Sequence, residues 1–212
     1  MKIYGNFLSP PANQVRLTAS ALGVDHEYLH VDLTKGEQRG ADFLAVNPFG
    51  KVPALVDGDF RLAESNAISR YLACRDGSDC AFYPNDIRQR ATIDKWMDHA
   101  GQNVRTQTGK VLFNKVFAPM LGMPVDDKAL AEGREQLGVA LGVIDAELAD
   151  RPYLAGDTAT IGDIAMIAAM EPFEMVEFDI ARFANVKRWR DGLMAQAWYT
   201  AVHARYGAEM AG

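Results

Sequence analysis

The chain has 212 residues, of which 49% are hydrophobic, enough for a packed core in one large domain or two small ones. Its formal net charge is −6 and its Lys and Arg residues form no basic run, so we do not expect it to bind nucleic acid. The first residues have a strand pattern and no long apolar run occurs, which predicts neither a signal peptide nor a transmembrane segment and favours a cytoplasmic protein.

The first half of the chain alternates short strands and helices. We expect a strand over residues 2–7, a helix over residues 13–22 that ends at Gly23, and a second strand over residues 28–33. A short helix then begins at residue 41 and ends before Pro48. The first two strands are expected to run parallel, because a helix connects them as a crossover.

A hairpin and a further helix follow. Asp57-Gly58 lies between two apolar runs, which predicts an antiparallel hairpin over residues 54–62. Ile68, Tyr71 and Leu72 recur at helical spacing, so we expect a helix with Ser65 as its N-cap. The resulting order, β-α-β-α-β-β-α, predicts an α/β domain with a thioredoxin-like fold.

The second half of the chain is predicted to be all helix. Periodic segments cover residues 88–117, 128–149, 162–176 and 186–195, with a further helix to Tyr206. We therefore predict a thioredoxin-like domain over residues 1–76, a polar linker over 77–86 and an all-helical domain over 87–212. Thr160 and Asp163 are spaced as a capping box, to which we assign a structural role.

Metal and disulfide chemistry have little support in the sequence. Cys74 and Cys80 have the spacing of neither a redox pair nor a metal site, and a reducing compartment accounts for them. The four histidines are scattered along the chain, so we predict no metal site.

Residues 47–65 contain the most informative pattern. Pro53 cannot donate a ladder hydrogen bond, so we expect it at a sheet edge after a cis peptide bond, where Val52 N–H and C=O can pair with an extended peptide. Ser65 at a helix N-terminus can bind a carboxylate, and Glu64 can pair with an ammonium group. Pro53 alone is also typical of an ordinary edge and Ser65 of an ordinary cap. Their combination predicts a site for glutathione, whose γ-glutamyl end carries both groups.

With these motifs the chain resembles the cytosolic glutathione S-transferase family, and most of all its bacterial, theta-like and phi-like branches. The opening residues 1–9, Val15-Arg16-Leu17, and the later segments 153–157 and 160–163 add to the resemblance, which covers nearly the whole chain. It implies that glutathione is a co-substrate and that there is no prosthetic group.

The resemblance also implies that Ser9 activates the glutathione thiol. A free thiol has a pKa near 8.5, and lowering it by about two units requires about 2.7 kcal/mol, most of which one hydrogen bond to the thiolate can supply. The alternative is that Ser9 simply caps a helix that begins at Pro10. Pro10 and Pro11 remove two N–H donors, so Asn13 is a second candidate donor, or itself an N-cap. Ala12 stands where a related bacterial subgroup carries cysteine, which excludes cysteine-based exchange there.

Further positions follow from the resemblance. Gln38 and Lys51 match contacts to the glycine carboxylate of glutathione, although each could be an ordinary exposed side chain. Phe49 matches an aromatic residue that plugs the partner subunit of a homodimer. Candidates for the apolar cleft of the second substrate, any of which could instead be core residues, are Phe7, Gln102, Arg105, Phe113, Phe117 and Met120.

The sequence therefore predicts a glutathione transferase that conjugates glutathione to a small apolar electrophile. Glutathione-dependent isomerases, dehalogenases, ether-cleaving enzymes and peroxide reductases would share this first half. A non-catalytic adaptor that keeps the fold and binds a protein partner is the alternative of a different class, motivated by the two prolines after Ser9.

Overall fold

The computed structural model describes residues 1–210, and side chains as far as His203. The chain forms two compact units. The first combines Met1–Asn85 with the segment from Met194 onward, and the second is Asp86–Leu193. The sequence predicted that the helical domain continues to residue 212, whereas the structure assigns the last helix to the first unit.

The first unit has the predicted β-α-β-α-β-β-α order. Its elements are β1 (Lys2–Gly5), α1 (Pro10–Ala21), β2 (Glu27–His30), α2 (Ala41–Val46), β3 (Ala54–Asp57), β4 (Phe60–Ala63) and α3 (Ser65–Cys74), with a 3-10 turn at Glu37–Arg39. The sheet has the strand order β2-β1-β3-β4, in which β1 and β2 are parallel and the other neighbours antiparallel. The predicted fold class is confirmed.

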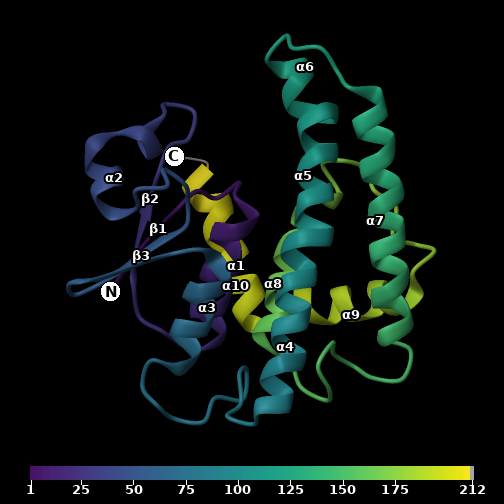
Figure 1. The fold of residues 1–212 in the computed structure, drawn as a ribbon. Helices are drawn as coiled ribbons and strands as arrows, with labels where there is room; N and C mark the ends of the chain where they lie inside the picture. The colour runs from purple at the N-terminus through teal and green to yellow at the C-terminus, as the bar shows by residue number, and fades with distance from the viewer. Residues whose placement is uncertain (211–212) are drawn as a thin grey trace. The chain divides into compact units, whose positions relative to one another are not determined.

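Helices cover both faces of this sheet (Figure 1). Side chains of a strand point alternately to its two faces. Accordingly, Ile3 and Leu55 pack in a cluster with residues of α1 and α3. Ala54, one position earlier on β3, packs instead with Phe43 of α2. The two faces of the sheet therefore pack against different helices.

The position of Pro53 differs from the prediction. We expected it at a sheet edge, but it directly precedes β3, which lies in the interior of the sheet between β1 and β4. The position just before a strand also tolerates a residue without an N–H, so proline is accommodated there. The Val52–Pro53 peptide bond is cis, as predicted.

The last helix, α10 (Ala197–Met210), packs against α1 within the first unit. Ser20 Oγ donates a hydrogen bond to the Trp198 carbonyl oxygen at 3.0 Å. Tyr199 and Val202 of α10 are buried. The first unit is therefore built from both ends of the chain.

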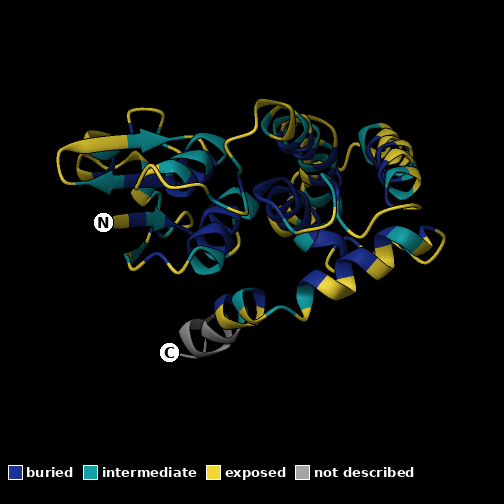
Figure 2. Cartoon of the chain, turned by 90° about the horizontal axis from the view of Figure 1, so that it is seen from below, coloured by how far each residue is buried: buried dark blue, intermediate teal, exposed yellow. Residues whose placement is uncertain are grey.

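The second unit consists of helices joined by loops. One nearly continuous helical run comprises α4 (Ile87–His99), a π-helical segment (Ala100–Arg105), α5 (Thr106–Leu112), a second π-helical segment (Phe113–Phe117) and α6 (Ala118–Met120). It is followed by α7 (Asp127–Glu147), α8 (Ile161–Met170), a 3-10 turn (Glu171–Phe173) and α9 (Ala184–Met194). Helices with one buried and one exposed side are visible in Figure 2.

Helix α8 is the core of the second unit, because all of its residues are buried. Its N-terminus carries the predicted capping box of Thr160 and Asp163. The fully buried Asp163 carboxylate also accepts hydrogen bonds from Leu154 N and Trp189 Nε1, both at 2.9 Å. Among the described residues, no helix is both long and apolar enough to cross a membrane.

Candidate functional site

The register of the sheet brings three predicted segments to one end of the first unit. Tyr4 lies opposite Ala54, and Ala54 lies opposite Ala63. The loop after β1 that leads to Ser9, the residues before β3 and the residues after β4 therefore leave the sheet at the same end. These are the segments that carry Ser9, Val52-Pro53 and Glu64-Ser65.

Two helices begin at this end. Gln14 of α1 donates to Asn66 of α3, and Thr18, one turn further along α1, lies 3.1 Å from Ser69 of α3. The two helices thus run parallel, with their N-termini toward the site. A helix N-terminus carries a partial positive charge, so this end of the unit suits an anionic ligand.

Ser9 occupies the N-cap position of α1, but its hydroxyl makes no capping hydrogen bond. An N-cap side chain usually accepts from the N–H of the second or third helical residue, and the second residue here is Pro11. The backbone of Ser9 is held, since its N–H donates to Asn6 O at 3.0 Å and its carbonyl accepts from Asn13 N at 2.9 Å. The structure therefore leaves the Ser9 hydroxyl uncommitted to the helix.

Two asparagines fix the loop that contains Ser9. Asn6 donates through Nδ2 to Val31 O at 3.0 Å and accepts from Leu8 N at 2.9 Å. Asn13 donates through Nδ2 to Phe7 O at 2.9 Å and is only 3% exposed. Asn13 lies in the first turn of α1, so it is not the N-cap, and this contact anchors the loop.

Asn47 arranges the backbone ahead of Val52. It is 2% exposed, its Nδ2 donates to Lys51 O at 2.6 Å, and its Oδ1 accepts from Phe49 N at 3.1 Å. Within residues 1–210, no backbone hydrogen bond engages Val52 N–H or C=O. Both groups of Val52 are thus available for hydrogen bonding.

Glu64, and not Ser65, is the N-cap of α3. The Glu64 carbonyl accepts the first helical bond, from Ile68 N at 2.9 Å, which places the cap one residue earlier than predicted. Its φ of 70° is uncommon for a residue other than glycine and costs about 1–3 kcal/mol, a strain that clusters at ligand sites. Ser65 is buried in the first turn of α3, directly after this N-cap.

Gln38 and Lys51 belong to neighbouring segments. Gln38 lies in the 3-10 turn, and a Cβ on Gly50 would lie 3.2 Å from the Gln38 carbonyl oxygen, so the backbones pass closely. Gln38 Oε1 is buried and has no hydrogen-bond partner among the described residues. Lys51 is exposed.

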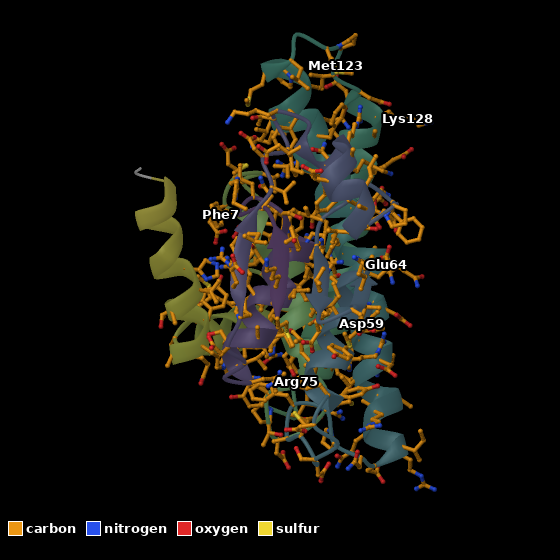
Figure 3. The ribbon with its side chains drawn as sticks, turned by 90° about the vertical axis from the view of Figure 1, so that its left-hand side faces the viewer. Phe7, Asp59, Glu64, Arg75, Met123 and Lys128 are labelled. Carbon is orange, nitrogen blue, oxygen red and sulfur yellow. The ribbon has the colours of Figure 1, made fainter. Side chains whose placement is uncertain are left out.

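The predicted second-substrate residues belong to both units. Phe7 stacks on His30, with ring centroids 4.3 Å apart, and lines a hollow of about 590 Å³ beside β2. Phe7 and Glu64 lie toward opposite edges of the first unit's sheet, whose outer strands are β2 and β4 (Figure 3). The other candidates belong to the second unit and are Gln102, Arg105, Phe113, Phe117 and Met120.

These second-unit residues are not core residues. Phe113, Phe117 and Met120 are 40%, 37% and 75% exposed. Gln102 and Arg105 lie on one π-helical segment, and Phe113 and Phe117 on the other. Such segments often occur at functional sites. Exposed apolar side chains on them are consistent with a binding surface.

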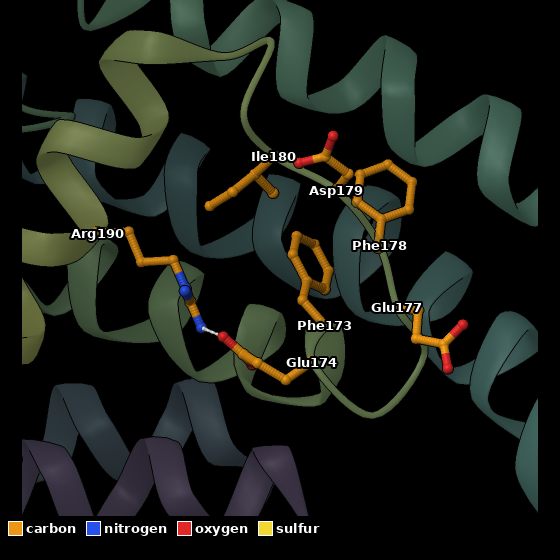
Figure 4. Close-up of a pocket in the computed structure, with 7 residues that line it drawn as sticks. All are labelled: Phe173, Glu174, Glu177, Phe178, Asp179, Ile180 and Arg190. Atoms are coloured by element: carbon orange, nitrogen blue, oxygen red, sulfur yellow. Dashed lines mark hydrogen bonds and ion pairs between the residues drawn. The ribbon is translucent and has the colours of Figure 1, made fainter.

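Sequence reasoning missed a hollow of about 280 Å³ in the second unit. Phe173 and Ile180 line it, and the buried Arg190 forms an ion pair there with Glu174 (Figure 4). It also missed the supporting roles of Asn6, Asn47 and Gln14, for which single polar residues in apolar surroundings were the only signal. Within the described residues no group of side chains is arranged to hold a metal ion, and Cys74 and Cys80 are free thiols.

A thioredoxin-like unit with two helix N-termini beside a cis-proline loop, followed by an all-helical unit, defines a two-part glutathione-binding fold. The family model described as "Glutathione S-transferase, N-terminal domain" matches residues 1–74, and "Glutathione S-transferase, C-terminal domain" matches residues 110–197. The chain belongs to the glutathione S-transferase family.

Individual relatives agree with this assignment. Glutathione S-transferase F10 of Arabidopsis thaliana is 36% identical over 87% of this chain and 87% of its own length. Human glutathione S-transferase theta-2B is 32% identical over 99% of this chain and 83% of its own. The structure of a glutathione S-transferase I bound with lactoylglutathione is 28% identical, has a TM-score of 0.82, and covers 96% of this chain and 98% of that one.

Proposed function

We propose that this protein is a glutathione transferase that binds glutathione at the end of the first unit's sheet and conjugates its sulfur to an apolar electrophile. The observation that carries the proposal is the convergence of Ser9, Val52 and Glu64-Ser65 at that end. The enzyme is of the glutathione S-transferase type, as its named relatives are, and uses glutathione as a co-substrate without a prosthetic group.

Each part of glutathione has a proposed partner. The unpaired backbone groups of Val52 hold the cysteinyl residue as an added strand. Ser65 and the N–H groups of the first turn of α3 bind the γ-glutamyl carboxylate, and the Glu64 carboxylate pairs with the γ-glutamyl ammonium. Lys51 and Gln38 bind the glycine carboxylate, Lys51 through its charge and Gln38 through its amide N–H.

The proposed chemistry is a nucleophilic substitution by the glutathione thiolate. The Ser9 hydroxyl donates a hydrogen bond to the thiolate and so lowers the thiol pKa, while the N-terminus of α1 adds a favourable partial charge. The thiolate then forms a carbon–sulfur bond with the electrophilic carbon as the leaving group departs with its electron pair. The thiol proton goes to solvent when the thiolate forms.

The electrophile is proposed to be small and apolar. Phe7 is the proposed apolar contact in the first unit. Phe113, Phe117, Met120, Gln102 and Arg105 of the second unit stay a prediction from the family resemblance. The intact glutathione-binding residues favour this function over that of a non-catalytic adaptor.

We further propose a homodimer and a cytosolic location. Phe49 is 68% exposed in the loop before Val52, where an aromatic side chain can insert into a partner subunit. The two free cysteines are consistent with a reducing compartment. Light scattering should show dimers for the wild type and a shift toward 23.3 kDa particles for Phe49→Ser.

Calorimetric titration with glutathione, followed by turnover of a chlorinated nitroaromatic substrate, tests the function. We expect binding at millimolar or lower glutathione and release of chloride. Absence of binding heat at millimolar glutathione would contradict the proposal. Binding without turnover on several electrophiles would indicate one of the specialised glutathione-dependent reactions.

A further inference from the structure

A cluster of buried and half-buried polar side chains joins α1 to α3 behind the candidate site. Gln14 and Ser69 are both 0% exposed. Gln14 Nε2 donates to Asn66 Oδ1 at 2.9 Å and to Ser69 Oγ at 3.2 Å. Thr18 Oγ1 lies 3.1 Å from Ser69 Oγ and donates to the Gln14 carbonyl at 2.8 Å. We call Gln14, Thr18, Asn66 and Ser69 the α1–α3 polar cluster.

The cluster stands out because the surrounding helix faces are apolar. Val15 and Ala19 of α1 pack with Ile68 and Leu72 of α3 in one hydrophobic core. Apolar contacts are not directional, so by themselves they allow one helix to slide along another. Buried hydrogen bonds are directional and are lost on sliding, since a buried polar group left unpaired is costly. The cluster thus fixes the axial register of the two helices.

The register matters because the two helices begin at different groups of the proposed ligand, α1 at the thiol and α3 at the γ-glutamyl carboxylate. Asn66 directly follows Ser65, which is proposed to bind the γ-glutamyl carboxylate. Gln14 lies five positions after Ser9, about 7.5 Å along the axis of α1. A shift of α1 relative to α3 would therefore move the thiol-activating hydroxyl away from the carboxylate-binding turn.

We propose that Gln14 and Ser69 are positioning residues for glutathione. Their hydrogen bonds set the distance between Ser9 at the thiol and Ser65 at the γ-glutamyl group, without either residue touching the ligand. The proposal rests on the proposed function, because it concerns the geometry of that same site.

The variant Gln14→Met tests the role, since methionine has a similar length but no amide donor. A displacement of about 1 Å at a reacting group can reduce a rate by about a hundredfold. We expect kcat/KM to fall by about ten- to a hundredfold, with a higher KM for glutathione and a higher pKa of the bound thiol. Ser69→Ala, a smaller change, should shift both quantities in the same direction and serves if Gln14→Met does not fold.

Thr108→Val is the matched control for loss of a buried hydrogen bond. Thr108 lies in the second unit, is 2% exposed, and donates through Oγ1 to Val104 O at 2.9 Å. Its replacement should lower the melting temperature without changing the glutathione KM or the thiol pKa. Thr18→Ser, which keeps the hydroxyl, should stay near wild-type values, whereas Thr18→Val should resemble Ser69→Ala.

The measurements are glutathione titrations and thiolate absorbance against pH, made well below each variant's melting temperature. Higher KM and thiol pKa for Gln14→Met or Ser69→Ala, with neither changed in Thr108→Val, would support the positioning role. If both cluster variants lose stability but keep the wild-type KM and thiol pKa, the cluster is only structural and the inference is wrong. If the wild-type chain itself binds no glutathione, the proposed function fails first and the inference fails with it.

Discussion

Replacing Ser9 with alanine should separate catalysis from stability. In a typical helix, removing an N-cap serine costs about 1 kcal/mol, because the side chain caps a backbone N–H. Ser9 makes no such bond, and the following Pro11 has no N–H to offer. We therefore expect Ser9→Ala to unfold at nearly the wild-type urea concentration.

The catalytic effect should be much larger. A hydroxyl that donates to a thiolate contributes about 1.5–3 kcal/mol, which corresponds to a rise of about one to two units in the thiol pKa when it is lost. Below the wild-type thiol pKa, the thiolate fraction, and with it the conjugation rate, should fall by about ten- to a hundredfold. The thiol pKa is measured from the ultraviolet absorbance of the bound thiolate against pH.

Asp86→Ala provides the matched control. Asp86 is the N-cap of α4, and its carboxylate accepts from Arg88 N at 3.0 Å and Gln89 N at 2.9 Å. Its loss should cost about 1 kcal/mol of stability and leave the thiol pKa unchanged. If Ser9→Ala, like Asp86→Ala, lowers stability and leaves the thiol pKa unchanged, Ser9 is only a helix cap. Asn13 or the N-terminus of α1 would then stabilise the thiolate.

Three further predictions concern other residues. Asp163→Asn places an amide N–H₂ against N–H and O–H donors that now bond to the carboxylate. The free energy of unfolding in urea should therefore fall by at least about 3 kcal/mol, and a fall below about 1 kcal/mol would contradict this account. Burial lowers the pKa of His99, so the unfolded chain takes up a proton before the folded one as the pH falls below about 6.5, and stability is lost there. His99→Gln should show a smaller drop in melting temperature between pH 7.5 and 5.5 than the wild type, and an equal drop would refute the assignment. Glu64→Gly removes the strain of the positive φ, so the free energy of unfolding should stay the same or rise by about 1 kcal/mol. The KM for glutathione should rise about tenfold, and an unchanged KM would show that Glu64 does not bind glutathione.

The fold of the first unit was predictable because local signals agreed with one another. Asp57-Gly58 indicated the hairpin, and Gly23 indicated the end of α1. The helical connection between the first two strands indicated that they run parallel. The sequence could not reveal strand order, which depends on pairing between distant segments. Pro53 was therefore expected at an edge, although β3 lies inside the sheet.

The candidate site was predictable in its motifs but not in its supports. Val52-Pro53 and Glu64-Ser65 have recognisable patterns, whereas Asn47 and Gln14 act through contacts that only the folded chain creates. The sequence predicted the cap of α3 one residue too late. Glu64 adopts a positive φ, which residues other than glycine usually avoid, so its side chain gave no indication of this conformation. The sequence assigned α10 to the helical domain, because the periodicity of a helix does not indicate which element it packs against.

The chain enters the first unit, leaves it at Asn85, and returns at Met194 to add α10. During synthesis, the surface of α1 that contacts Trp198 stays uncovered until more than a hundred intervening residues have been made. Ribosome-bound chains that stop before Met194 should therefore present an unsealed α1 to chaperones, even though every residue proposed to touch glutathione has already emerged.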